Sequence, residues 1–289
     1  MDAFSAGLLC RTIDPFHSAS YFVPETEEKF GALGMDNRMR YFASRSAPMG
    51  AVSAGVVAAT FYNFNPELVA AKIPAAWQIA SPAAVTRMRY EIVEEAMPRV
   101  LGEQLAGSSE LARGAVILRR AAESIPDGDG RPLYAAHAEL PWPQSVCGQL
   151  WHAVTLLREY RGDGHIAALI AHELGGLEAL ITHSAAGIGF TNDFARRLRG
   201  WSAEQWDAGV DRLRDRGLLD AAGKLTPLGD DVRSRIEDLT DDLAYQPWRT
   251  IPDDQADELR RLARAVRAAV LSAGVLPAAG LGPRFGEHR

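Results

Sequence analysis

The chain has 289 residues and is 47% hydrophobic, so it can bury one large core or two smaller ones. This composition excludes a disordered chain and a small domain that depends on disulfides. Its 37 acidic side chains outnumber its 31 basic ones, and the net charge of -6 gives no general attraction to nucleic acid or to an anionic membrane surface.

Proline signals in residues 1–125 predict an N-terminal helical domain. Pro24, with acidic residues directly after it, predicts the first turn of a helix. Residues 51–62 are apolar nearly all round and predict a buried central helix. Pro66 predicts a further short helix, and Pro82 predicts the start of a long one.

A loop rich in glycine and proline at residues 126–132 predicts a domain boundary, with the second domain at residues 126–289. The proline-rich stretch at residues 140–145 predicts an extended connector. After Cys147, apolar residues recur at helical spacing on both sides of residues 161–164, which read RGDG. We interpret this region as a central pair of helices joined by a tight turn at RGDG.

Residues 201–243 predict a winged helix. Ser202 and Gln205 have the spacing of a capping box at the start of a helix that ends near Gly217. Two short strands at residues 217–220 and 224–226 predict a small β-hairpin, the wing, and Pro227 predicts the start of the next helix. The expected fold class is therefore mostly α, with a helical N-terminal domain, a central helical pair and a C-terminal winged helix with a small β-hairpin.

Two family resemblances follow from these stretches. Residues 212–219 and 225–229 contain the patterns RGLL and LTPLG, and this segment resembles the winged helices of MarR-like regulators. The whole chain resembles an actinobacterial helix-turn-helix family of unassigned role, through residues 41–64, residues 150–169 and the wing segment. The resemblances imply a regulator-like fold and carry over no site residues.

The charge of the winged-helix segment disfavours DNA as a partner. Residues 196–243 contain 9 basic and 11 acidic side chains. A protein that reads duplex DNA gathers Lys and Arg to displace counterions from the phosphates. We therefore expect the segment to mediate a contact with a protein partner or within a homodimer.

The densest polar cluster lies at residues 158–165. Arg158 and Arg161 can clamp a carboxylate or phosphate, because guanidinium groups bind these anions in a bidentate manner. Asp163 and His165 can form a pair in which the carboxylate orients the imidazole. The alternative is that the arginines pair with nearby acids and Asp163 caps the following helix. His152 lies on the same side of this helix as Glu159 and joins the candidate set.

A second set of candidate ligand-binding residues is aromatic. The run at residues 61–64, together with Trp77, can line a pocket for a small, partly apolar ligand, and Arg45 is its polar member. The alternative interpretation is that these side chains belong to the core. The candidates in this set are Arg45, Phe61, Tyr62, Phe64 and Trp77.

Three histidines are weak candidates for a metal or haem site. His165 and His172 are seven residues apart, and His183 follows eleven residues later. Glu173 and Glu178 can join them as ligands. None of these histidines has the HxxxH or HExxH spacing that marks a helical metal site.

Two remaining features concern the compartment. Cys10 and Cys147 show neither metal-ligand spacing nor a disulfide framework, which indicates a reducing environment. The first residues lack signal-peptide character, and no stretch reaches the roughly 18 uninterrupted apolar residues of a membrane span. We expect a cytoplasmic protein with no membrane partner.

The leading functional prediction is a winged-helix, regulator-like or ligand-sensing protein that binds a small, partly apolar molecule. The alternative is an enzyme or a metal- or haem-binding protein that uses the cluster at residues 158–165. The sequence names no cofactor and no reaction.

Overall fold

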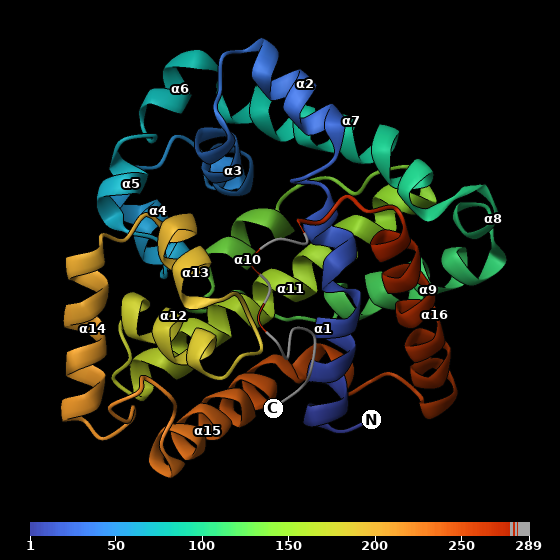
Figure 1. Cartoon of the computed structure of the whole chain (residues 1–289). Coiled ribbons are helices and arrows are strands. Elements are labelled where there is room, and N and C mark those ends of the chain that lie inside the picture. The colour runs from blue at the N-terminus through green and yellow to red at the C-terminus, as the bar shows by residue number, and fades with distance from the viewer. Residues whose placement is uncertain (278–279, 281, 283–289) are drawn as a thin grey trace. The chain divides into compact units, whose positions relative to one another are not determined.

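A computed structural model describes residues 1–277, 280 and 282 and is mostly helical (Figure 1). The chain forms two compact units, each assembled from separate segments. Unit 1 comprises Met1–Val52, Lys72–Gly164 and Asp241–Pro277, and unit 2 comprises Ser53–Ala71, His165–Thr240 and Ala278–Arg289. A division into independently folding domains at residues 125/126 remains a prediction.

Unit 1 is built from helices of very different lengths. Its elements are α1 (Ala3–Ala19), α2 (Pro24–Ala32), α3 (Asn37–Ser46), the 3₁₀-helix η1 (Ala47–Met49), α6 (Ala75–Ile79), α7 (Pro82–Leu101), α8 (Glu103–Ala106), α9 (Ser109–Glu123), α10 (Pro132–Ala138), α11 (Val146–Ala171) as far as Gly164, η2 (Gln246–Trp248) and α16 (Asp253–Ser272).

Prolines set the helix starts in unit 1 as the sequence predicts. Pro24 and Pro82 each occupy the first turn of a helix, where the missing amide proton costs no hydrogen bond. Ser81 caps α7 by accepting from the amide of Ala84 at 3.3 Å. Residues 141–145 contain no helix, as predicted.

The core of unit 1 includes the packing of α1 along α16 (Figure 1). The α1 side chains Ile13 and Phe16 are buried. Helix α9 also packs on α16, and Gly114 allows the close approach, because a Cβ there would lie 2.0 Å from Cδ2 of Leu262. Much of the apolar burial of unit 1 therefore depends on the C-terminal helix.

The predicted turn at residues 161–164 is wrong, because α11 runs through these residues without interruption. Gly164 serves packing instead. A Cβ at this position would lie 2.7 Å from Nη1 of Arg131, whose guanidinium donates to the carbonyl oxygens of Tyr160 and Leu243. A glycine in a helix interior costs about 1 kcal/mol in propensity, and the contacts of the half-buried arginine outweigh that cost.

Unit 2 is also helical. Its elements are α4 (Ala54–Phe61), α5 (Pro66–Ala70), α11 from His165, α12 (Gly176–Ala185), α13 (Asn192–Arg199), α14 (Ala203–Asp215) and α15 (Pro227–Ala244) as far as Thr240. Leu177, Leu180, Trp206, Leu213 and Ile236 belong to its buried core. The predicted central helix at residues 51–62 is shorter than expected and partly exposed, since Val56 is 42% exposed.

The predicted β-hairpin is also wrong, although the mostly α class is confirmed. Within the described residues, the segment between α14 and α15 forms only an isolated antiparallel bridge between Leu219 and Leu225. The Asp220 carboxylate accepts from the amides of Ala222 and Lys224 at 2.8 and 2.9 Å. These turn amides are satisfied by a side chain, and Pro227 begins α15 before a strand can extend.

Candidate functional site

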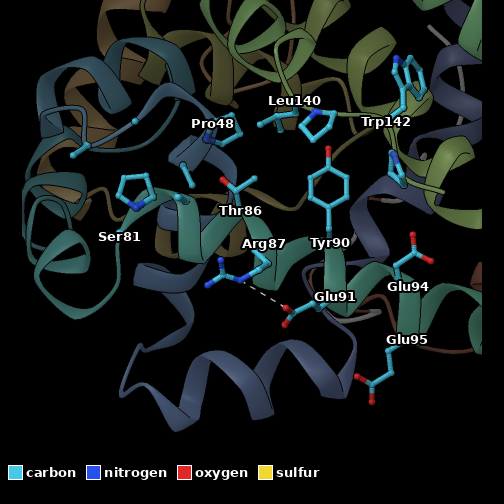
Figure 2. Close-up of a pocket in the computed structure, with 17 residues that line it drawn as sticks. Pro48, Ser81, Thr86, Arg87, Tyr90, Glu91, Glu94, Glu95, Leu140 and Trp142 are labelled. Carbon is cyan, nitrogen blue, oxygen red and sulfur yellow. Dashed lines mark ion pairs between the residues drawn. The ribbon is translucent and has the colours of Figure 1, made fainter. Parts of the chain in front are cut away.

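A cavity of about 1240 Å³ lies in unit 1 between α7, the segment at residues 47–51 and the connector at residues 140–143 (Figure 2). Its walls include the apolar side chains of Pro48, Pro82, Leu140, Pro141, Trp142 and Pro143. Thr86 and Tyr90 point from α7 toward Pro48 and Leu140. This combination of apolar walls and a few polar groups is typical of a small-molecule site.

Local sequence explains how the cavity forms. Thr86, Tyr90 and Glu94 recur every four residues on α7, so they share one face of the helix. The prolines of the connector prevent helix formation and keep this segment extended opposite that face. The sequence predicted both elements. It gave no sign that they meet, because α7 and the connector are separated by the whole of α8 to α10.

Tyr90 is tied to a buried histidine behind the cavity wall. Its hydroxyl lies 2.6 Å from Nδ1 of His152, and Trp142 packs edge to face on the same imidazole with ring centroids 4.6 Å apart. His152 is 0% exposed, and burial lowers its pKa to about 4, with Arg89 acting in the same direction. His152 is therefore neutral at pH 7. Tyr90 and Trp142 were missed as site candidates.

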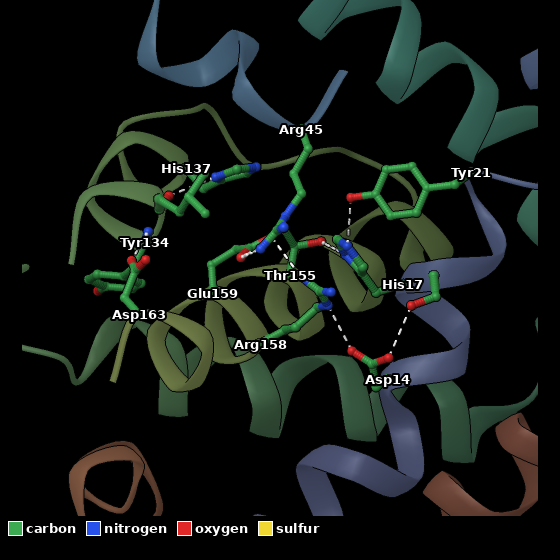
Figure 3. Close-up of polar contacts among 12 residues, drawn as sticks. Asp14, His17, Tyr21, Arg45, Tyr134, His137, Thr155, Arg158, Glu159 and Asp163 are labelled. Carbon is green, nitrogen blue, oxygen red and sulfur yellow. Dashed lines mark hydrogen bonds and ion pairs between the residues drawn. The ribbon is translucent and has the colours of Figure 1, made fainter. Parts of the chain in front are cut away.

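A buried ion cluster lies elsewhere in unit 1 and explains Arg45 (Figure 3). Arg45 donates to both carboxylate oxygens of Glu159 at 3.1 and 2.8 Å, and Arg158 donates to Glu159 at 2.8 Å and to Asp14 at 2.8 Å. Glu159 is 0% exposed. Burial alone would raise the pKa of Glu159, but the two guanidinium groups outweigh it and hold the pKa well below its ordinary value.

A series of hydrogen bonds through the His17 imidazole lies beside this cluster (Figure 3). Arg89 donates to the Tyr21 hydroxyl at 3.1 Å, Tyr21 bonds with Nε2 of His17 at 2.9 Å, and Nδ1 of His17 bonds with Thr155 at 2.8 Å. Burial holds the pKa of His17 well below its ordinary value, and the charges of Arg158 and Arg89 add to this effect. Both ring nitrogens of the neutral His17 have hydrogen-bond partners, so this group of contacts has the character of a structural network.

The candidates at residues 158–165 do not converge on one site. Arg158 faces Glu159 and Asp14, whereas Arg161 donates to the buried carboxylate of Asp241 at 3.0 Å. Asp163 accepts from the amide of Tyr134 at 3.0 Å, and His165 bonds through Nδ1 with Thr240 at 2.8 Å. The proposed pair of Asp163 and His165 is therefore divided between different partners. Asp163 caps α10 instead of the helix that contains it.

The aromatic candidates lie in two different units. Phe61 and Phe64 are buried in unit 2 with ring centroids 6.3 Å apart, and the Tyr62 hydroxyl donates to the carbonyl of Leu174 at 2.7 Å. Trp77 belongs to unit 1, where its indole nitrogen donates to the carbonyl of Val52 at 3.0 Å. None of these four residues lines the cavity described above.

The three candidate metal ligands have separate surroundings. His165 bonds with Thr240, and Nδ1 of His172 bonds with the carbonyl of Ala168 at 2.9 Å. Burial lowers the pKa of His183 to about 4, and the charge of Arg233 adds to this effect. Among the described residues, no group of three or more His, Cys, Asp or Glu side chains is arranged to hold a metal ion.

Asp163 gives a testable dependence of stability on pH. Burial raises its pKa to about 6, although the amides of Tyr134 and Leu133 act in the opposite direction. The folded state therefore binds a proton that the unfolded state releases near pH 4, and stability falls as the pH rises from about 4 to about 6. We expect the free energy of unfolding of Asp163→Asn, taken relative to wild type, to be about 2 kcal/mol higher at pH 7 than at pH 4.

The measurement is urea unfolding at both pH values, with Asp163→Ala as the comparison. The alanine variant leaves the α10 amides without their acceptor, so it should be destabilised at both pH values. A difference between Asp163→Asn and wild type that does not change with pH would contradict the assignment.

Unit 2 contains a helix-turn-helix arrangement formed by α13 and α14. Gly200 ends α13 in the left-handed conformation with φ of 77°, and Ser202 and Gln205 form the predicted capping box of α14. Asn65 holds the turn between them, because its Nδ2 donates to the carbonyl of Gly200 at 2.9 Å and to Oε1 of Gln205 at 3.0 Å. The turn therefore has a fixed geometry.

Arg212 and Arg214 of α14, and Arg216 at its C-terminal cap, are engaged by acceptors within unit 2. Arg212 pairs with Glu178 at 2.6 Å, and Arg214 donates to the carbonyl of Ala221 at 2.9 Å. Arg216 donates to the carbonyl of Glu173 at 2.7 Å. The same helix exposes four acidic side chains, which are Glu204, Asp207, Asp211 and Asp215.

These features define a helical protein in which a helix-turn-helix unit accompanies a unit with a ligand-sized cavity. A family model described as a helix-turn-helix family matches residues 6–277. The chain belongs to this family, which confirms the predicted helix-turn-helix class. No curated protein and no solved structure matches the chain. Among the helices that the structure describes, none combines the length and the hydropathy needed to cross a membrane.

Proposed function

We propose that this helix-turn-helix protein is regulator-like and binds a small, partly apolar molecule in the cavity between α7 and the connector. The observation that carries the proposal is the cavity itself. At about 1240 Å³ it is somewhat larger than the usual range for ligand pockets, roughly 300–1,000 Å³, so it has room for a small molecule. Tyr90 and Trp142 supply aromatic surface, and Thr86 supplies a hydroxyl group.

A ligand in this cavity would contact α7, the segment at residues 47–51 and the connector together. These three parts of the wall come from distant stretches of the chain, and the connector itself has no regular secondary structure. A molecule that contacts all three stabilises the form of unit 1 in which they are assembled. Binding is therefore expected to raise the melting temperature of the protein.

A neutral apolar fluorophore tests the proposal. Nile red should bind the wild-type protein with increased emission, and Thr86→Trp should weaken the binding at least about tenfold, because the larger side chain projects into the cavity and takes up the space beside Tyr90 and Pro48. The matched control is Leu271→Trp, which places the same side chain at a position that is 48% exposed on α16. Equal binding by both variants and wild type would place the dye elsewhere and contradict the proposal.

We further propose that α13 and α14 contact a protein partner, or a second copy of this chain, in preference to duplex DNA. The arginines of α14 already have acceptors, and its exposed face is rich in carboxylates. A phosphate backbone would have to displace these contacts and approach negative charge. The resemblance to MarR-like regulators remains a prediction, and so does the formation of a homodimer.

The proposal that α13 and α14 contact protein in preference to DNA predicts weak binding to duplex DNA. In a mobility-shift assay at about 150 mM salt, the protein should bind generic duplex DNA only in the micromolar range or more weakly. Replacing Asp207 and Asp211 with Asn should strengthen the binding, because it removes two exposed negative charges from α14. Nanomolar binding by the wild-type protein would contradict the prediction.

A further inference from the structure

We propose that the ligand of the α7 cavity is an organic ammonium ion, that is, an amine with an apolar body, and that Glu94 binds its charged group. This inference rests on the proposed function and specifies the substance class for the same cavity. It is carried by the balance of charges around the cavity, by the position of Glu94 and by the aromatic walls.

The charged side chains that line the cavity are Arg87, Glu91, Glu94 and Glu95. Arg87 pairs with Glu91 at 3.9 Å, as Figure 2 shows, and Lys29 pairs with Glu95 at 3.2 Å. Within the described part of the chain, no ion pair engages Glu94. The lining therefore has an unbalanced carboxylate, which favours a cationic ligand over an anionic one.

The position of Glu94 is set by a glycine. Its Oε1 lies 2.2 Å from the point where a Cβ on Gly148 would stand, and the side chain of Pro143 lies 2.8 Å from the same point. Gly148 thus allows the carboxylate to lie against the start of α11, beside a residue of the cavity wall. Glu94 also follows Tyr90 by one helical turn, so its charge and an aromatic ring occupy the same side of the cavity.

The aromatic walls suit the same ligand class. An ammonium group is attracted to the faces of Tyr and Trp rings, and an apolar body packs against the prolines. The polar group behind this wall, His152, is neutral at pH 7, because burial lowers its pKa to about 4. Arg119 stacks over Trp142 with 4.5 Å to the ring centroid, and it is paired with Glu123 at 2.8 Å. The other cation near this wall is the buried Arg89, which donates to His137 and to the Tyr21 hydroxyl and is not among the residues that line the cavity.

Three matched probes test the inference by displacement of Nile red from the wild-type protein: 4-phenylbutylamine, 4-phenylbutan-1-ol and 4-phenylbutanoic acid. The amine should bind about twofold to fivefold more tightly than the alcohol, because its hydrogen bond to Glu94 is charge-assisted but partly exposed to water, and the acid should bind most weakly. Glu94→Gln should abolish the preference for the amine and leave the alcohol unchanged. Glu91→Gln, one turn earlier on α7, should keep the preference.

The results separate the two proposals. Glu94 is exposed, so Glu94→Gln should fold with an unchanged melting temperature. Equal binding of amine and alcohol to the wild-type protein would overturn the ammonium inference, as would a preference that survives Glu94→Gln. Displacement by none of the three probes while Nile red binds would overturn it as well. If Nile red itself does not bind, the proposed function fails, and the inference fails with it.

Discussion

Replacing Glu159 with alanine should lower the free energy of unfolding by about 3–5 kcal/mol. The carboxylate is 0% exposed and accepts three hydrogen bonds from Arg45 and Arg158. Its removal leaves the Arg45 guanidinium in a largely buried position without its bidentate partner. The cost is that of an uncompensated buried charge, which exceeds the contribution of an ordinary salt bridge. Urea unfolding followed by circular dichroism measures the loss.

The control for this prediction is Glu123→Ala. Glu123 pairs with Arg119 at 2.8 Å one helical turn away, but both side chains are partly exposed, so the loss should stay below about 1 kcal/mol. Glu159→Gln should fall between the two, because the amide oxygen still accepts a hydrogen bond. Losses of similar size for Glu159→Ala and Glu123→Ala would show that the buried cluster contributes no more to stability than an exposed ion pair.

The buried cluster also shows where sequence reasoning reaches its limit. Arg45 stood out because its neighbours are apolar, and Arg158 and Glu159 were visible as a polar cluster. Nothing in the local pattern indicated that Arg45 and Glu159, 114 positions apart, are partners. Ion pairs of this kind arise from tertiary packing, whereas helical spacing reports only on neighbours within one helix.

Helix starts were predicted well, because their causes are local. Proline at the first turn and a capping serine act within three residues, as at Pro24, Pro82 and Ser202. The turn at residues 161–164 was misread because a local preference for a turn was outweighed by tertiary packing, in which Gly164 lies against Arg131 from a distant segment. The β-hairpin was misread because strand pairing needs more residues than the segment before Pro227 supplies.

The cavity could not be predicted from the sequence for the same reason. The extended connector and the long helix α7 were each expected, but it is tertiary packing that brings them together. The predicted site relied on the aromatic run at residues 61–64, where Phe61 and Phe64 are core residues of unit 2. Tyr90 and Trp142 carried a weaker signal, a single aromatic residue in each element. An isolated aromatic side chain is usually interpreted as part of the core.

A second large effect is expected at Gly176, the first residue of α12. Helix propensity alone predicts that Gly176→Ala stabilises the protein by up to about 1 kcal/mol. The packing of unit 2 predicts the opposite sign, because the new Cβ would lie 1.8 Å from the carbonyl oxygen of Tyr62. That carbonyl belongs to the backbone, and the Tyr62 side chain is anchored by its hydrogen bond to Leu174 at 2.7 Å. We expect a loss of about 1–3 kcal/mol.

The neighbouring glycine provides a matched control for this prediction. A Cβ at Gly175 would lie 2.6 Å from Oε2 of Glu178, which is the end of a flexible side chain, and moving it costs at most its ion pair with the exposed Arg212. Gly175 has φ of -67°, so alanine can adopt its backbone conformation, and Gly175→Ala should cost less than about 1 kcal/mol. In thermal unfolding, the melting temperature of Gly176→Ala should therefore lie well below those of Gly175→Ala and wild type. A melting temperature for Gly176→Ala at or above that of wild type would mean that propensity dominates and that the Tyr62 carbonyl does not press on α12.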